Sequence, residues 1–268
     1  MTTWVNGIES DSILNTDRSF QYGDGCFSTI LTMNGQLHLW GRHLQRLRMT
    51  LDRLKIAQPN WEQVQWWLNN AILDAPKAGI KIHISRGSGG RGYSVRGFHT
   101  PLVTISNFSY PEQYLMLSQQ GIRLGICSSP LGINPLLAGL KHNNRLEQVL
   151  LKAEMETLDY TDGIALDIHG NVIETTMANV FWARSGTIYT SKLTNSGVAG
   201  VMRAQVIDDL TLLSIEVVEG YFSIDSLLNA DEVFITNAIM QVVPVIAIRD
   251  QDYDIGSITR RLQEKAIS

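Results

Sequence analysis

The sequence predicts an α+β protein, because tight-turn signals and helical apolar stripes occur in both halves of the chain. Asn-Gly and Ser-Gly pairs between short apolar runs favour β-hairpins, and they stand at Asn6-Gly7, Asn34-Gly35 and Ser185-Gly186. Leucines recur at helical spacing at Leu44, Leu47, Leu51 and Leu54. Hairpins interleaved with helices argue against a doubly wound parallel sheet.

The first part of the chain is expected to alternate strands and helices. After the Asn6-Gly7 hairpin, Gly23 and Gly25 give a loop the backbone freedom to enter a strand at residues 27–33. This Gly-x-Gly pair lacks the preceding strand and following helix of a dinucleotide site, so we do not assign it that role. The remaining elements expected here are a strand at 36–39, helices at 41–56 and 61–74, and strands at 80–84 and 102–108.

Residues 111–120 contain Pro111 and several glutamines, a composition that predicts a linker between two domains. We therefore expect a smaller N-terminal α/β domain at residues 1–110 and a larger C-terminal α/β domain at residues 121–268, which carries Lys141. The elements expected in the second domain are strands at 122–126, 163–167, 215–219, 233–236 and 242–248, and helices ending near 213, at 223–228 and at 257–266.

Composition excludes several classes of function. The 268 residues carry a net charge of −4, so no basic surface for nucleic acid is expected. No apolar run approaches the roughly 20 residues that a membrane helix needs, and the first residues lack the charge and apolar core of a signal peptide. Cys26 and Cys127 match no metal-ligand spacing, which favours a reduced cytoplasm and no metal site.

Lys141 is the first candidate for chemistry. It follows a loop broken by Pro130 and Pro135 and precedes apolar residues at helical spacing, namely Leu146, Val149, Leu150 and Ala153. A lysine desolvated at such a place has a lowered pKa, and a neutral amine attacks carbonyls and forms Schiff bases. Taken alone, the stretch is more typical of a surface lysine near a helix start.

Four other places carry polar groups in patterns typical of binding sites. Arg46 flanks the leucine stripe, and Glu174 ends a short apolar run; taken alone, each fits a solvated surface charge. The loop at residues 86–93 contains glycines and arginines that suit a carboxylate, although a flexible surface loop has the same composition. The glycine-bearing loop at residues 194–203 leads into a helix, whose free N–H groups suit a phosphate.

These stretches together resemble the fold type IV pyridoxal 5′-phosphate enzymes, the family of branched-chain and D-amino-acid aminotransferases. The resemblance runs through residues 20–27, 85–93, 138–149 and 200–203, Glu174 with Asn179, and Asn237-Ala238 with Pro244, which together span nearly the whole chain. Two stretches resemble the 4-amino-4-deoxychorismate lyases within that family, namely Ser85-Arg86-Gly87-Ser88-Gly89-Gly90-Arg91-Gly92-Tyr93 and Lys141-His142-x-Asn144-Arg145-Leu146-Glu147-Gln148-Val149.

The resemblance implies a site for each part of pyridoxal 5′-phosphate. Lys141 would form the Schiff base with the cofactor aldehyde, Glu174 would hold the pyridine nitrogen protonated, and Arg46 would bind the phosphate. The other cofactor-binding residues implied are Asn179, Val201, Met202, Asn237 and Ala238. The family architecture implies two α/β domains with the cofactor in the cleft between them, and a homodimer.

The implied activity is conversion of 4-amino-4-deoxychorismate to 4-aminobenzoate and pyruvate in folate biosynthesis. Phe27 stands where D-amino-acid aminotransferases carry Tyr, which argues against transamination as the main task. Arg91, with Tyr93 beside it, is the expected partner of a substrate carboxylate, because Arg86 directly follows a strand and suits a brace. An aminotransferase on the same scaffold and a non-catalytic binding protein are the alternatives.

Overall fold

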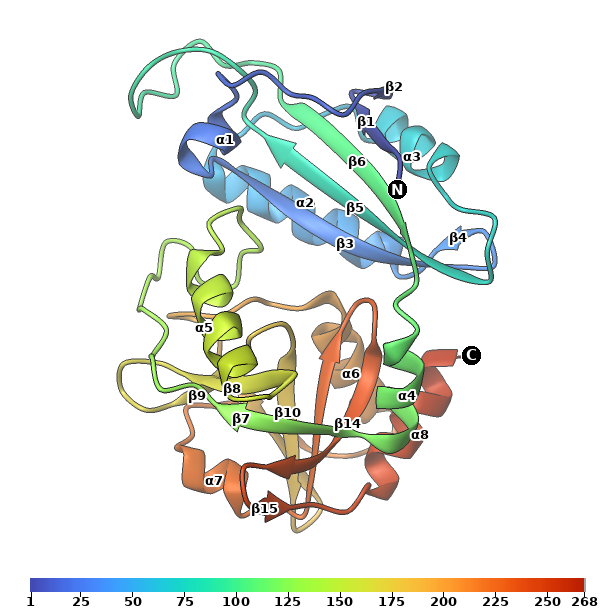
Figure 1. Ribbon diagram of the computed structural model, residues 1–268, viewed down its shortest axis with the longest axis vertical. Helices are drawn as coiled ribbons and strands as arrows, with labels where there is room; N and C mark the ends of the chain where they lie inside the picture. Colours follow the sequence, from blue (N-terminus) through green and yellow to red (C-terminus); the bar gives the residue numbers. More distant parts are fainter. Residues whose placement is uncertain (268) are drawn as a thin grey trace. The chain divides into compact units, whose positions relative to one another are not determined.

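The computed structural model describes residues 1–267 and divides into two compact units (Figure 1). Unit 1 comprises Met1–Tyr110 together with Leu140–Asn144, and unit 2 comprises Pro111–Gly139 and the chain from Arg145 onward. Each unit has its own β-sheet and its own buried core. The mixed α+β architecture expected from the sequence is confirmed.

Unit 1 is built on a six-stranded sheet in the order β2-β1-β6-β5-β3-β4. Its core joins one face of the sheet to two helices, because alternate strand residues such as Ile80, Ile82 and Ile84 are buried against Leu47 and Leu51. The elements are β1 (Thr3–Val5), β2 (Ile8–Glu9), α1 (Arg18–Tyr22), β3 (Gly25–Met33), β4 (Gln36–Leu37), α2 (Trp40–Leu54), α3 (Trp61–Asn70), β5 (Lys77–Ser85) and β6 (Leu102–Ser109).

Unit 2 is built on a nine-stranded mixed sheet in the order β12-β11-β10-β13-β14-β7-β8-β9, with β15 paired to β14. Its largest core cluster contains Trp182, Val243 and Val245, which are fully buried. The elements are α4 (Gln113–Gln120), β7 (Ile122–Ile126), α5 (Leu146–Thr157), β8 (Asp162–Leu166), β9 (Val172–Thr175), β10 (Asn179–Arg184), β11 (Thr187–Ser191), α6 (Val201–Leu212), β12 (Val217–Gly220), α7 (Ile224–Leu228), β13 (Glu232–Asn237), β14 (Gln241–Ile248), β15 (Gln251–Asp252) and α8 (Ser257–Ile267).

The predicted hairpin turns are present. Asn6 and Gly7 have φ angles of 48° and 81°, as a type I′ turn requires of its two central residues, and β1 pairs with β2 on either side. Asn34-Gly35 and Ser185-Gly186 also have positive φ at both positions. These pairs therefore set the register of the strands that flank them.

The structure differs from the sequence-based expectation in the linker and around Lys141. Most of the expected linker is helix α4, because its Gln, Leu and Met residues are good helix formers and Pro111 precedes the first turn. Lys141 falls within unit 1 by its contacts, although the flanking chain on both sides belongs to unit 2. Helix α5 begins only at Leu146, whose side chain is exposed, as are those of Val149 and Leu150.

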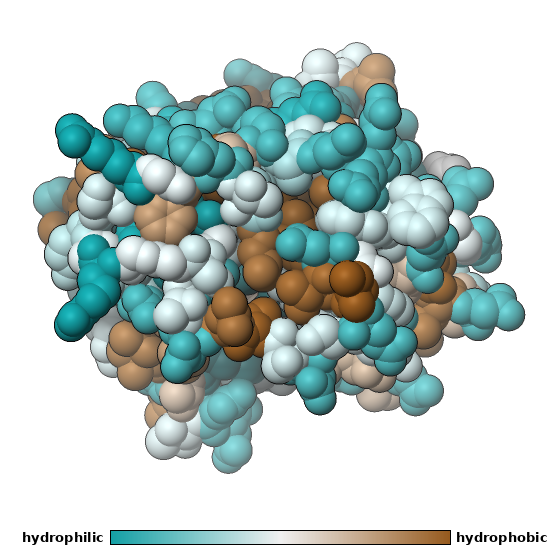
Figure 2. Space-filling view, turned by 90° about the horizontal axis from the view of Figure 1, so that it is seen from above, coloured by the Kyte–Doolittle hydropathy of each residue, from teal (hydrophilic) through white to brown (hydrophobic). Residues whose placement is uncertain are grey.

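Apolar side chains are not confined to the cores. On the face seen in Figure 2, brown apolar residues gather in the middle and hydrophilic residues surround them. None of the helices in the described part of the chain has the length and apolar character needed to cross a membrane.

Candidate active site

Lys141 lies in a short extended segment that pairs with the start of β3. The N–H of Phe27 donates to the Lys141 carbonyl at 3.0 Å, and the N–H of Asn143 donates to the Gly25 carbonyl at 3.0 Å. Lys141 Nζ lies 4.6 Å from the centroid of the Phe27 ring. The half-buried amine is thus held against an aromatic face, on backbone fixed by an edge-strand pairing.

Asn143 fixes the end of this segment through its side chain. Its Nδ2 donates to Ser19 Oγ at 2.8 Å and lies 2.8 Å from His83 Nε2. Burial, with a smaller effect from the Lys81 charge, lowers the pKa of His83, so its neutral ring accepts the bond from Asn143. A Cβ on Gly25 would come within 2.5 Å of Asn143 Nδ2, so only glycine lets the two segments approach this closely.

Arg46 is buried, with 8% of the residue exposed, rather than a surface charge. Its Nη2 donates to Ser28 Oγ at 2.7 Å, and Ser28 Oγ in turn lies 2.7 Å from His43 Nδ1. Burial, helped by the charge of Arg46, holds the pKa of His43 well below its usual value, and the Nδ1 atom of the neutral ring can accept a hydrogen bond from the Ser28 hydroxyl. Ser28 and His43 therefore orient a desolvated guanidinium, the group best suited to a phosphate.

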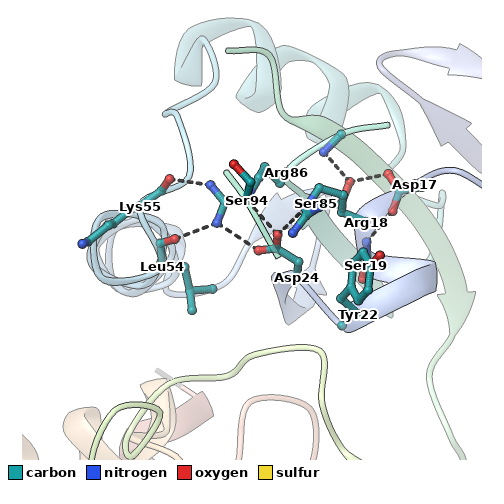
Figure 3. Close-up of polar contacts among 12 residues, drawn as sticks. Asp17, Arg18, Ser19, Tyr22, Asp24, Leu54, Lys55, Ser85, Arg86 and Ser94 are labelled. Carbon is teal, nitrogen blue, oxygen red and sulfur yellow. Dashed lines mark hydrogen bonds and ion pairs between the residues drawn. The ribbon is translucent and has the colours of Figure 1, made fainter. Parts of the chain in front are cut away.

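A carboxylate between two arginines braces the loop that precedes β3 (Figure 3). Asp24 Oδ2 accepts from Arg18 Nε at 2.8 Å and from Arg86 Nε at 2.7 Å, while Arg86 Nη2 donates to Asp24 Oδ1 at 3.0 Å. Burial opposes the charge, but the hydrogen bonds from Arg86 and Arg18 lower the pKa of Asp24. Arg86 also donates to the carbonyls of Leu54 and Lys55 at the end of α2, so Arg86 is a brace, as its position after a strand indicated.

Glu174 and Asn179 of unit 2 both bind the main chain of Val198, one at its N–H and the other at its carbonyl. Glu174 Oε2 accepts from the Val198 N–H at 2.9 Å, and Asn179 Nδ2 donates to the Val198 carbonyl at 2.9 Å. Glu174 is 5% exposed, so it is not the solvated loop carboxylate that the sequence alone also allowed. A buried carboxylate with one hydrogen bond from the main chain is oriented for a cationic partner.

The chain leading to Lys141 is tied to the loop that carries Val198. The N–H of Gly139 donates to the Gly197 carbonyl at 2.9 Å, and the N–H of Ala199 donates to the Gly139 carbonyl at 3.0 Å. Beyond Lys141, burial lowers the pKa of Arg145, while the charge of Glu174 opposes that shift. Arg145 is therefore electrostatically coupled to Glu174, a relationship the sequence spacing did not indicate.

The start of α6 offers main-chain donors. No side chain caps this helix, and the side chains of Val201 and Met202 are buried, so only their N–H groups are available to an anion. A Cβ on Gly200 would lie 2.1 Å from Asn179 Oδ1, so glycine is required for the loop to close on Asn179.

The turn between β13 and β14 is the other predicted part of the site in unit 2. Asn237 Oδ1 accepts from the N–H groups of Ile239 and Met240 at 3.0 and 2.9 Å, which shapes the turn around Ala238. Asn237 Nδ2 reaches the Met177 carbonyl at 3.3 Å. Asn237 thus holds the turn with both ends of its side chain.

Arg91 and Tyr93 lie in the long loop between β5 and β6, and both side chains are exposed, Tyr93 by 85%. The ring of Tyr93 meets that of Tyr22 edge to face at 5.7 Å between centroids. Unit 1 therefore contains Arg46, Phe27, Lys141 and this loop, and unit 2 contains Glu174, Asn179, the start of α6 and the Asn237 turn.

Residues 25–248 match the family model described as amino-transferase class IV. The chain belongs to the class IV aminotransferase family. Within this family, an aminodeoxychorismate lyase from Vibrio harveyi is 50% identical over 264 residues, which cover 97% of each chain. A D-alanine aminotransferase from Bacillus licheniformis is 28% identical over 253 residues, which cover 92% of this chain and 88% of the relative.

Solved class IV structures share the fold. The crystal structure of 4-amino-4-deoxychorismate lyase from Pseudomonas aeruginosa superposes with a TM-score of 0.93 at 34% identity and covers 98% of this chain and 97% of that one. The branched-chain amino acid aminotransferase of Escherichia coli gives a TM-score of 0.86 at 24% identity, with 98% and 92% covered, a likeness of fold alone.

Class IV enzymes use pyridoxal 5′-phosphate, and the residues described above fit that group chemically. A buried arginine and uncapped helix N–H groups suit its phosphate, and a buried carboxylate suits its pyridine nitrogen. The primary amine of Lys141 is the kind of group that forms a Schiff base with an aldehyde.

Proposed function

We propose that this chain is an aminodeoxychorismate lyase, which converts 4-amino-4-deoxychorismate to 4-aminobenzoate and pyruvate in folate biosynthesis. The observation that carries the proposal is the 50% identity to the Vibrio harveyi lyase across 97% of both chains. Relatives with aminotransferase names stand at 26–29% identity.

Lys141 acts as the attachment point of the cofactor aldehyde and then as the base. Bound pyridoxal 5′-phosphate supplies an electron-withdrawing ring conjugated to the substrate nitrogen. Lys141 Nζ takes the proton from the ring carbon that bears this nitrogen, and the enolpyruvyl group leaves from the neighbouring carbon as the ring becomes aromatic. Lys141 returns the proton to the departing group, which gives pyruvate and balances the reaction without another reactant.

The other site residues bind and orient pyridoxal 5′-phosphate. Glu174 keeps the pyridine nitrogen protonated, supported by its bond from Val198. Arg46 and the main-chain N–H groups of Val201 and Met202 bind the phosphate. Asn237, Ala238 and Asn179 complete the cofactor contacts by shaping the turn and the loop that hold these groups.

The substrate side of the site involves Phe27, Arg91 and Tyr93. The substrate carries two carboxylates, which require cationic or amide-rich contacts. Arg86 is committed to Asp24, whereas the exposed Arg91 is available to a carboxylate, with the Tyr93 hydroxyl beside it. Phe27 presents an apolar face beside Lys141.

We further propose a cytoplasmic homodimer that binds neither nucleic acid nor membrane. Exposed apolar side chains support an interface between copies: in unit 2 Leu136, Leu146, Val149 and Leu150 are 59–80% exposed, and in unit 1 Leu14 and Phe20 are exposed. The net charge of −4 does not favour nucleic acid. Cys26 and Cys127 are buried free thiols, which fits a reducing compartment.

A side-by-side assay separates the proposal from its alternatives. The purified protein with pyridoxal 5′-phosphate is given either 4-amino-4-deoxychorismate, or D-alanine or a branched-chain amino acid with 2-oxoglutarate. The lyase forms 4-aminobenzoate in the first case and little glutamate in the second. Faster glutamate formation would make it an aminotransferase, and a protein that stays colourless with added cofactor would be a binding protein.

A further inference from the structure

Gly92, which lies between Arg91 and Tyr93, is held on both of its main-chain polar groups by helix α1. Arg18 Nη1 donates to the Gly92 carbonyl at 2.9 Å, and the Gly92 N–H donates to the Tyr22 hydroxyl oxygen at 3.1 Å. The Tyr93 ring meets the Tyr22 ring edge to face. Helix α1 thus binds the loop at Gly92, the residue between the two candidate substrate contacts Arg91 and Tyr93.

Arg18 is built into this position. It is 2% exposed, and its guanidinium carbon lies 4.8 Å from the ring centroid of Tyr22 and 5.0 Å from that of Phe98, a residue near the other end of the loop. Its Nε is bonded to Asp24 (Figure 3). A planar guanidinium makes these contacts simultaneously, which the single ammonium of a lysine does not.

The loop that carries Arg91 and Tyr93 is long and rich in glycine, so its order depends on contacts with other elements. Residues 86–101 connect β5 to β6, and Gly89, Gly90 and Gly92 have φ angles of 125°, 60° and 78°. Glycines carry the largest conformational entropy cost on ordering, and most side chains of this loop are exposed. Contacts that fix the main chain of Gly92 therefore reduce the number of conformations open to the neighbouring Arg91 and Tyr93.

We propose that Arg18 and Tyr22 are positioning residues that clamp Gly92 and so hold Arg91 and Tyr93 where a substrate carboxylate binds. This inference rests on the proposed function for the role of the loop. The clamp acts on substrate binding, because the contacts of Arg18 and Tyr22 lead to Asp24, Gly92, Tyr93 and Phe98. We expect cofactor attachment to be unchanged.

The matched control is Arg86, whose side chain donates to both carboxylate oxygens of Asp24 and to the carbonyls of Leu54 and Lys55, and in these bonds does not reach Gly92. Amide hydrogen exchange of the holoenzyme compares Arg18→Lys and Tyr22→Phe with Arg86→Lys and the unmodified protein. We expect faster exchange in peptides covering residues 88–96 in the first two variants only. Unchanged exchange in both, or an equal change in Arg86→Lys, would overturn the clamp.

Steady-state kinetics test whether the clamp contributes to substrate binding. Loss of one hydrogen bond to the loop should raise KM for 4-amino-4-deoxychorismate about two- to tenfold, with kcat and the absorbance of bound cofactor nearly unchanged. Faster exchange without a rise in KM would refute the role in substrate binding. If the unmodified protein forms no 4-aminobenzoate, the proposed function fails, and the exchange comparison still decides whether α1 holds the loop.

Discussion

Glu174 Oε2 accepts a hydrogen bond of 2.9 Å from the main-chain N–H of Val198, where only 5% of Glu174 is exposed. A glutamine at this position can accept the same bond through its amide oxygen, so Glu174→Gln should fold and bind cofactor. The uncharged amide cannot hold a pyridine nitrogen protonated, and we expect kcat to fall roughly a hundredfold or more.

The measurement is the rate of 4-aminobenzoate formation at saturating cofactor, alongside a cofactor titration. Glu264→Gln, at an exposed glutamate of the same unit, is the control. Turnover close to normal in Glu174→Gln would mean that another group keeps the nitrogen protonated.

Arg46→Ala should chiefly weaken cofactor binding. Loss of a charge-assisted phosphate contact costs about 1.5–3 kcal/mol, which is roughly tenfold or more in Kd. Ser28→Ala keeps the guanidinium and removes the hydroxyl that links Arg46 to His43, so its effect on cofactor binding should be smaller. Equilibrium titration with pyridoxal 5′-phosphate measures both, with Arg53→Ala, an exposed arginine of the same helix, as the control. Equal affinities in Arg46→Ala and Arg53→Ala would contradict the assignment.

The burial of Arg46 and Glu174 was not visible in the sequence pattern alone. Each is a charged residue beside an apolar stripe or run, where a solvated charge is the commoner outcome. Their hydrogen-bond partners come from other elements: Ser28 of β3 accepts from Arg46, and Val198, in a loop, donates to Glu174. Pairings between distant segments leave no periodic signal, and it was the family resemblance that singled these residues out.

Arg91 and Arg86 should behave in opposite ways when replaced by alanine. The exposed Arg91 should be dispensable for folding, but its loss should raise KM for 4-amino-4-deoxychorismate without changing the bound-cofactor spectrum. Arg86 is 6% exposed and donates to Asp24, Leu54 and Lys55, so its loss should lower the free energy of unfolding by roughly 1–3 kcal/mol. Thermal unfolding and steady-state kinetics of both variants test this. A normal KM in Arg91→Ala would move carboxylate recognition elsewhere.

Stability should fall as the pH drops below about 6.5 because of His43. Its pKa in the folded protein is well below the ordinary 6.5, through burial first and the Arg46 charge second. The unfolded chain therefore binds the extra proton near pH 6.5 while the folded chain does not, and each such proton costs about 1.4 kcal/mol per pH unit. His83 contributes with the same sign.

His43→Asn keeps an acceptor for Ser28 and removes the titrating ring. Its free energy of unfolding, measured by denaturant titration between pH 5 and 8, should decline less steeply below about pH 6.5 than that of the unmodified protein. Parallel curves over the whole range would show that His43 titrates alike in both states.

Local signals predicted the fold well where they act within a few residues. The Asn6-Gly7 pair forms the expected turn, and the leucine stripe forms α2. Residues 113–120, expected as part of a linker, form helix α4, whose Leu and Met residues have a helix propensity that Pro111 and the polar glutamines obscured in the sequence. The position of Lys141 depends on its pairing with Phe27, more than a hundred residues earlier, so no local pattern placed it in unit 1.

The most direct test of the account is product formation by the unmodified protein and by Lys141→Ala, each supplied with pyridoxal 5′-phosphate and 4-amino-4-deoxychorismate. We predict that the unmodified protein releases 4-aminobenzoate and pyruvate in equal amounts, and that Lys141→Ala releases neither above background while remaining folded. Borohydride reduction and peptide mapping should place the pyridoxyl label on Lys141. Sustained turnover by Lys141→Ala, or a label on another lysine such as Lys55 or Lys152, would contradict it.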